Sequence, residues 1–209
     1  IIGGGSAGLR AAIEAHDAGA HVLIISKSKK GDPHTVLARG GINAALGTMD
    51  PEDNWMVHAA DTLKEGEFLA DYERVEVLCK NAPDAVNELV KWGARFHREK
   101  DGRLTQRFFG AHTYRRTVFY EDWTGEEIIR VLMDQVSQRK IEIIDNVYIT
   151  KLLKSGDVGK KKPRSTSVLH HLHHLHHKIY LVKSSSLMSS PRCLSTYSAS
   201  TVTLDGLCG

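Results

Sequence analysis

A glycine-rich turn at the start of the chain constrains its fold more than any other feature. Gly3-x-Gly5-x-x-Gly8 follows an apolar pair at residues 1–2 and leads into an Ala-rich segment at 9–18. In a nucleotide-binding βαβ unit, the first glycine allows a tight turn, the second lets the backbone approach a pyrophosphate, and the third lets the helix pack closely on the strand. The amino end of the helix then directs unpaired amides at the phosphates. An ordinary glycine turn is the alternative. The motif predicts a dinucleotide site formed by Gly3, Gly4, Gly5, Ser6, Ala7 and Gly8.

The segments on either side of this turn predict an α/β fold. Residues 21–26 form a short, continuous apolar run, which is typical of a parallel strand that is covered on both faces. Between the turn and this run, Gly19 stands at the C′ position of a helix. A strand, a helix and a second strand around a glycine turn predict a doubly wound parallel sheet of the Rossmann type. Only two apolar residues precede Gly3, whereas strands usually have about five, so we expect an incomplete domain.

Hydrophobic periodicity predicts helical insertions further along the chain. The helices are expected at residues 52–66, 72–80, 83–93 and 124–140, and strand segments at 141–144 and 147–149. Pro83 would lie in the first turn of its helix, where a missing amide does no harm. Asp101-Gly102 predicts a two-residue hairpin turn. Thr124 and Glu127 have the spacing of a capping box, in which each side chain satisfies a backbone amide at the helix start.

The composition changes after Asp157. Residues 1–157 carry a net charge of −3, whereas residues 158–209 carry +6 and include a histidine-rich run at 170–177. Ten serines fall between residues 165 and 200. Such bias is typical of a segment that cannot bury enough apolar surface to become ordered. We therefore expect a partial nucleotide-binding domain at 1–157 and a low-complexity, basic tail without stable packing at 158–209.

Charge, hydropathy and cysteine usage exclude several classes of protein. The predicted domain is mildly acidic and has no basic stripe, so we expect no nucleic-acid partner. No apolar run approaches the roughly 20 residues that span a bilayer. The cysteines Cys79, Cys193 and Cys208 have no C-x-x-C spacing, which favours a reducing, cytoplasmic compartment. The histidine run could bind zinc, copper or nickel, but it lacks a scaffold, so we assign no metal site. A His-rich metal-binding protein remains the alternative of another class.

A series of ordered motifs carries a resemblance to a known family. The acidic residue expected about 20 positions after the glycine turn is replaced by Ser26-Lys27, which disfavours NAD. From this pair onward, the chain resembles the flavoproteins of succinate dehydrogenase and fumarate reductase, whose close relatives are the L-aspartate oxidases. The matching residues are Ser26-Lys27, His34-Thr35-Val36, Ala38, Gly40-Gly41-Ile42-Asn43-Ala44-Ala45, Asp101-Gly102-Arg103, Gln106-Arg107, Phe109-Gly110 and Thr124-Gly125.

The resemblance implies FAD as the cofactor. It assigns the glycine loop to the FAD pyrophosphate, Ser26-Lys27 to the adenosine ribose, and the segment around His34 to the flavin ring. The residues implied to bind FAD beyond the glycine loop are Ser26, Lys27, His34, Thr35, Ala38, Gly40 and Gly41. In membrane-bound members, a histidine at the position of His34 is joined covalently to the flavin. The L-aspartate oxidases lack this histidine, so His34 favours the succinate and fumarate branch, with an oxidase fragment as the runner-up.

The resemblance also implies what the intact parent does. Such a flavoprotein transfers a hydride between flavin N5 and a C4 dicarboxylate, exchanges electrons with an iron–sulfur subunit, and lies peripherally on the inner face of a membrane. The family binds its dicarboxylate through a His-Pro-Thr-Gly segment and later residues, and this chain contains no His-Pro dipeptide. We therefore assign no catalytic residue, and we expect this chain alone to lack succinate or fumarate activity.

Four other polar positions complete the candidates. Arg39 stands where the family usually carries Gln or Glu beside the flavin, and a cation there would stabilise a reduced, anionic flavin. His97 and His112 are isolated in the sequence, and we expect structural roles for them. Glu127 is assigned to helix capping rather than to acid–base chemistry.

Overall fold

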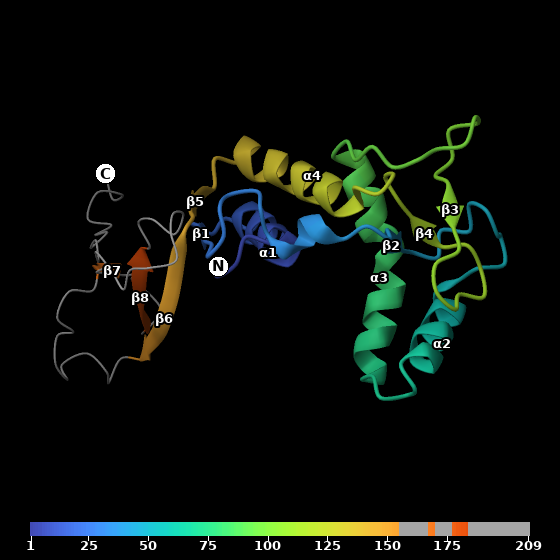
Figure 1. Cartoon of the computed structure of the whole chain (residues 1–209), viewed down its shortest axis with the longest axis horizontal. Helices are drawn as coiled ribbons and strands as arrows, with labels where there is room; N and C mark the ends of the chain where they lie inside the picture. Colours follow the sequence, from blue (N-terminus) through green and yellow to red (C-terminus); the bar gives the residue numbers. More distant parts are fainter. Residues whose placement is uncertain (155–166, 170–176, 184–209) are drawn as a thin grey trace, which may run out of the picture.

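A small parallel sheet forms the centre of the molecule. The computed structural model describes residues 1–154, 167–169 and 177–183 (Figure 1). Strand β1 (Leu23–Ile25) pairs in parallel with β5 (Glu142–Ile144), with Ile24 opposite Ile143. On its other edge, β1 forms a parallel bridge between Ile25 and Ile2. The segment before the glycine turn therefore runs beside the two-stranded sheet, and the predicted α/β fold of the Rossmann type is confirmed.

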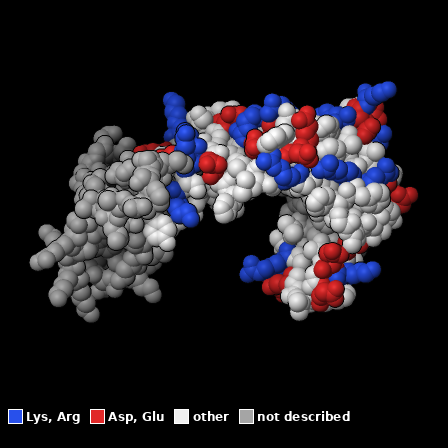
Figure 2. Space-filling model, viewed as in Figure 1, with Lys and Arg blue, Asp and Glu red and all other residues white. Residues whose placement is uncertain are grey.

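Both faces of β1 are covered, as the apolar run predicts. Ile24 is fully buried and belongs to the same core cluster as Leu9 of α1 (Ser6–Asp17) and Val131 of α4 (Thr124–Gln138). Ile25 points to the opposite face and packs with Val147, the first residue of β6 (Val147–Lys154). Helices α1 and α4 lie side by side (Figure 1), and Arg139 donates to the Asp17 carboxylate at 2.7 and 2.8 Å across their ends. Basic and acidic residues are interspersed along this edge of the molecule (Figure 2).

Strand β6 belongs to a separate antiparallel sheet. It pairs antiparallel with β8 (His177–Lys183), which in turn pairs with β7 (Ser167–Leu169). Both strands belong to the expected tail at 158–209. The rest of that segment, including most of the histidine run, lies outside the described residues, so its lack of stable packing stays a prediction.

A helical hairpin projects away from the sheet (Figure 1). It consists of α2 (Trp55–Glu65) and α3 (Tyr72–Lys91). Asn54 caps α2, because its Oδ1 accepts hydrogen bonds from the amides of the second and third helical residues at 3.0 and 3.2 Å. Asp71 caps α3 in the same way, accepting from the amide of Arg74 at 3.1 Å. Local capping thus fixes where both helices begin.

The predicted helix boundary at Pro83 is wrong. Helix α3 runs without interruption from Tyr72 to Lys91, with Pro83 inside it. A proline in a helix interior is unfavourable by about 3 kcal/mol, because it removes one hydrogen bond and crowds the preceding turn. The buried stripe of α3 extends on both sides of the proline and outweighs this local penalty. Its members are Val75, Cys79, Ala82, Val86 and Leu89.

A second, antiparallel sheet lies beside the helical hairpin. Its strand order is β2 (Ile42–Asn43), β4 (Thr117–Val118) and β3 (Gln106–Arg107). The turn that precedes β3 differs from the predicted two-residue turn. Gly102 N donates to Glu99 O at 2.9 Å, so Lys100 and Asp101 occupy the centre and Gly102 follows with φ of +88°. This is a three-residue hairpin loop, in which the glycine supplies the left-handed conformation.

The predicted capping box at the start of α4 is also wrong. Thr124 Oγ1 accepts from the amide of Tyr120, at 3.0 Å, rather than from an amide of its own helix. The Glu127 carboxylate has no exposed surface and binds two arginines. It accepts from Arg95 N and Nη2 at 2.7 Å each, and from Arg130 Nη2 at 2.6 Å. A pair within α4, to Arg130, and a tertiary pair, to Arg95, therefore replace the local cap, and the second joins α4 to the chain that follows α3.

This ion pair predicts a pH-dependent contribution to stability. Burial alone would raise the pKa of Glu127, but Arg130 and Arg95 lower it from 4.5 to about 2. A carboxylate with a depressed pKa stabilises the fold above its unfolded pKa, and this contribution is lost as the pH falls through the folded pKa. We expect Glu127→Gln to lower the free energy of unfolding by about 1.5–3 kcal/mol at pH 7, in urea titrations.

The difference from the wild type should shrink below pH 4.5 and approach zero near pH 2. Glu126→Gln is the matched control, because the Glu126 side chain is 51% exposed. A pH-independent effect of Glu127→Gln would contradict this assignment.

Candidate functional site

The glycine turn leaves the start of α1 open. Gly5 precedes the helix in an extended conformation (φ −80°, ψ 178°), and as a glycine it provides no side chain to cap the helix. The first amides of a helix have no partner within the helix, and of those in α1, Ser6 N donates to Thr35 Oγ1 at 3.3 Å, while those of Ala7 and Gly8 point toward the open end. Gly3 adopts φ of +107°, and a Cβ on Gly8 would lie 2.0 Å from Gly3 O. Gly3 thus allows the tight turn, and Gly8 allows the close approach of the helix, as the sequence predicts.

Ser26 lies directly beside this turn. A Cβ on Gly4 would lie 3.1 Å from Ser26 Oγ. The backbone of Ser26 is fixed by its neighbours, since its amide donates to Ile144 O at 2.8 Å and its carbonyl accepts from Val147 N at 3.0 Å. Ser26 is buried, whereas the adjacent Lys27 is exposed. The sheet therefore brings the predicted ribose-binding serine to the glycine loop.

A short 3₁₀ helix, η1 (His34–Leu37), also lies against the glycine loop. Ser6 N donates to Thr35 Oγ1 at 3.3 Å, and a Cβ on Gly5 would lie 3.4 Å from the same oxygen. His34, in the same turn, is exposed. The structure therefore brings together two segments that are far apart in the sequence and that were both predicted to bind the cofactor.

The glycine pair after η1 connects this region to the second sheet. Arg107 Nη2 donates to Gly40 O at 2.9 Å, and a Cβ on Gly40 would lie 2.7 Å from the Phe109 ring. Gly41 has φ of +124°, and a Cβ there would lie 2.5 Å from Val118 O. Only glycine fits this approach of two backbones. The two predicted glycines thus lie where the loop packs against the second sheet and enters its edge strand β2.

Arg39 binds residues that precede α4. Its Nη1 donates to Asp122 O at 2.7 Å, and its guanidinium carbon lies 4.0 Å from the centre of the Trp123 ring. The cation is therefore held by the residues that precede α4. Trp123 was not predicted to have any role, because nothing in the sequence links it to Arg39.

Sequence reasoning also missed a buried charge cluster. Arg116 is fully buried and binds Asp53 Oδ1 through Nη2 at 2.8 Å and Asp61 Oδ2 through Nη1 at 2.7 Å. Burial, followed by the charge of Arg116, lowers the pKa of His58 to about 4, so this imidazole is neutral at pH 7. As the pH falls from 6.5 toward 4, His58 takes up a proton in the unfolded chain but stays neutral in the fold, so this residue makes the fold less stable. No local pattern reveals the cluster, because its members come from separate segments.

The cluster supports β2, the strand that follows the glycine pair. Ala44 N donates to Arg116 O at 2.9 Å, and Thr117 Oγ1 donates to Asn43 Oδ1 at 2.7 Å. Asn43 Nδ2 also lies 3.2 Å from His112 Nε2. The other predicted structural histidine, His97, stacks on Phe119 with 4.7 Å between ring centres. The structural roles expected for both histidines stay predictions.

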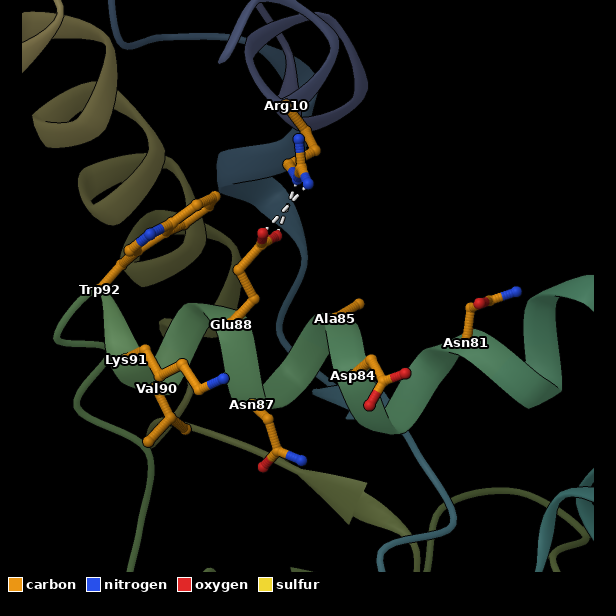
Figure 3. Close-up of a pocket in the computed structure, with 9 residues that line it drawn as sticks. All are labelled: Arg10, Asn81, Asp84, Ala85, Asn87, Glu88, Val90, Lys91 and Trp92. Atoms are coloured by element: carbon orange, nitrogen blue, oxygen red, sulfur yellow. Dashed lines mark hydrogen bonds and ion pairs between the residues drawn. The ribbon is translucent and has the colours of Figure 1, made fainter. Parts of the chain in front are cut away.

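An open groove of about 770 Å³ lies between α1 and α3 (Figure 3). Arg10 reaches across it and binds the Glu88 carboxylate at 2.7 and 3.0 Å, while its third nitrogen binds Glu14 at 2.7 Å. The guanidinium lies 5.6 Å from the centre of the Trp92 ring. Because Arg10 and Glu88 bind each other across the groove, and no predicted site residue lines it, we assign it no ligand.

Two properties of the described residues bear on function. They contain no group of three or more His, Cys, Asp and Glu side chains that could hold a metal ion. Of the helices in this part of the chain, none has the length and apolar character needed to cross a bilayer.

The arrangement around the glycine loop fits a dinucleotide. The uncapped start of α1 offers backbone amides and a positive dipole end to a pyrophosphate, which carries negative charge. Ser26 offers a hydroxyl beside the loop, and Thr35 of η1 contacts the loop as well. The direct contacts of these residues with FAD stay a prediction.

Comparison with known proteins identifies relatives of the whole described domain. The family model of the FAD binding domain matches residues 1–170. A fumarate reductase (CoM/CoB) subunit from Methanothermobacter marburgensis is 46% identical over 156 residues, which cover 73% of this chain and 28% of the relative. The succinate dehydrogenase flavoprotein subunit of Rickettsia bellii is 39% identical over 166 residues, which cover 75% of this chain and 28% of the relative.

Other matches support the same grouping. A chloroplastic L-aspartate oxidase from Oryza sativa is 40% identical over 136 residues, covering 65% of this chain and 20% of the relative. The structure of the Mycobacterium smegmatis Sdh1 complex in its apo form superimposes with a TM-score of 0.71 and 42% identity, over 73% of this chain and 28% of that one. The chain thus spans little more than a quarter of the length of these succinate dehydrogenase and fumarate reductase relatives.

The buried charge cluster predicts a large difference between two arginines. Arg116→Met would leave two carboxylates unpaired in the interior, so we expect the free energy of unfolding to fall by about 3–5 kcal/mol. Arg103→Met is the matched control, because Arg103 pairs with Asp101 at the surface and its side chain is 59% exposed. Such a pair contributes less than about 1 kcal/mol. Urea unfolding of the full chain at pH 7 measures both, and equal effects would contradict the proposed importance of the cluster.

Proposed function

The chain belongs to the FAD binding domain family, and from this premise we propose that it forms the FAD site of a succinate dehydrogenase or fumarate reductase flavoprotein. FAD is the cofactor that the family supports. The observation that carries the proposed site is the convergence of the uncapped start of α1, Ser26 and η1 around one loop. The residues proposed to bind FAD are Gly3, Gly4, Gly5, Ser6, Ala7, Gly8, Ser26, Lys27, His34, Thr35, Ala38, Gly40 and Gly41.

Each group of residues has a distinct task in this proposal. The first-turn amides of α1 hold the pyrophosphate, and Gly5 keeps the space that a side chain would fill. Ser26 and Lys27 hold the adenosine ribose. His34 and Thr35 lie on the side of the flavin ring, and His34 is exposed and therefore accessible to it. Bound FAD supplies hydride transfer at N5, and these residues orient it.

The activity of the intact protein is a further proposal. The relatives are named fumarate reductase and succinate dehydrogenase, which supports hydride exchange between the flavin and a C4 dicarboxylate. Both names describe subunits, which supports assembly with other subunits, and we propose an iron–sulfur protein as the electron partner. We also propose that the parent lies peripherally on a membrane. We assign no catalytic residue to this chain.

L-aspartate oxidation is the second candidate within the same chemistry. A relative of that name covers a smaller share of this chain than the succinate dehydrogenase subunit does, 65% against 75%. His34 also favours the succinate and fumarate branch. A metal-binding role for the histidine run concerns a segment that lies largely outside the described residues, and no observation supports it.

Titration of the purified full chain with FAD and with NAD tests the proposed site. We expect FAD to bind at least tenfold more tightly and to give visible absorbance, because Ser26-Lys27 replaces the acidic ribose anchor. Gly5→Ala should weaken FAD binding at least tenfold by filling the pyrophosphate approach. It should leave the unliganded fold intact, because the added Cβ would lie 3.4 Å from Thr35 Oγ1, an ordinary contact.

Gly66→Ala is the matched control for this substitution. Gly66 lies at the end of α2, where φ is −81° and an added Cβ would lie 3.2 Å from Thr62 O, so this variant controls for a small backbone adjustment away from the proposed site. Unfolding of the unliganded variants, followed by circular dichroism, separates a binding effect from a folding effect. Stronger binding of NAD, or unchanged FAD affinity in Gly5→Ala, would refute the proposed site.

A further inference from the structure

The start of α4 and the segment η1 approach each other through their backbones. Gly125 N donates to Ala38 O at 2.9 Å. A Cβ on Gly125 would lie 1.9 Å from Thr35 O, and 3.0 Å from both the nitrogen and the oxygen of Ala38. Contacts below 3.0 Å essentially never occur, and here the opposing atoms belong to the backbone. Any side chain at position 125 would therefore force α4 and η1 apart.

Arg39 forms a second attachment between the same two segments. It follows η1 directly, and its guanidinium donates to Asp122 O and stacks on Trp123. A cation over an indole ring contributes about 0.5–1 kcal/mol at an exposed site, and the Arg39 side chain is 45% exposed. The turn that opens α4 thus holds the end of η1 through one backbone hydrogen bond and one side chain.

The glycine loop holds η1 less firmly. Its contacts with η1 are the hydrogen bond from Ser6 N to Thr35 Oγ1 at 3.3 Å and a hydroxyl contact with Ser6 Oγ at 3.5 Å. Both distances are longer than usual, since N–H···O bonds typically measure about 2.7–3.2 Å and O–H···O bonds about 2.5–3.0 Å. The position of η1 relative to α1 is therefore determined mainly by α4, which itself packs against α1 in the core.

The geometry points to Gly125 as a positioning residue for FAD. Its missing side chain sets how closely η1, with His34 and Thr35, lies to the start of α1. Gly125 does not touch the cofactor, and it acts through Thr35 and Ala38. This inference rests on the proposed function, because it concerns the width of the proposed FAD site.

Hydrogen exchange and FAD titration of the full chain test this role. In the unliganded chain, Gly125→Ala should speed exchange at the amides of Val36 and Ala38, which donate to Pro33 O and Thr35 O. Exchange within α2 and α3 should stay unchanged. FAD affinity should fall at least tenfold in Gly125→Ala and stay within twofold of the wild type in Gly66→Ala. A residue with a merely structural role would lower stability without changing local exchange or affinity.

Arg39→Ala is a second, milder variant that adds no atoms. It should weaken FAD binding about threefold to tenfold. If Gly125→Ala does not fold, this variant alone tests whether the attachment of η1 to α4 affects FAD binding. A wild-type chain that fails to bind FAD would overturn the proposed function and this inference with it. A wild-type chain that binds FAD, together with foldable Gly125→Ala or Arg39→Ala chains that bind it equally well, would overturn this inference alone.

Discussion

Close approach between backbones at three glycines is the constraint on which the rest of the structure depends. A Cβ on Gly8 would lie 2.0 Å from Gly3 O, one on Gly125 would lie 1.9 Å from Thr35 O, and one on Gly41 would lie 2.5 Å from Val118 O. Each contact joins two segments that meet at the proposed cofactor site. The first joins α1 to its strand, the second joins α4 to η1, and the third joins the loop after η1 to the second sheet. Side chains at these positions would separate the segments.

Buried charges hold the outer parts of the domain in place around these contacts. Arg116 binds Asp53 and Asp61, which lie before and within α2, and its carbonyl accepts the amide of Ala44 just after β2. Glu127 binds Arg95 and Arg130, which ties α4 to the end of α3. A buried pair is strongly unfavourable to break on one side, because the remaining charge is left without a partner. These pairs thus resist relative movement of the helical hairpin and the sheets.

The sequence correctly predicted those elements that are determined by a few neighbouring residues. The glycine turn, the apolar run of β1 and Gly19 after α1 each depend on a few neighbouring residues, and the structure agrees with them. Pro83 and Glu127 show where local rules fail. The proline remains inside α3 because a buried stripe on both sides of it packs against the core, and Glu127 leaves its cap because two arginines from other positions offer stronger bonds. The packing of the stripe and the Glu127–Arg95 pair lie outside any short window of sequence, whereas Arg130 is only three residues from Glu127.

The same distinction applies to the candidate site. The sequence predicted which residues surround the loop, but not that α4 supports η1, since Gly125 and Thr35 are 90 residues apart. Arg39 illustrates the consequence. Considered alone, a cation in this segment suggests direct stabilisation of a reduced flavin. In the structure, the guanidinium binds Asp122 O and lies over Trp123. These contacts give Arg39 a task in joining η1 to the start of α4, which no reading of the residue alone would suggest.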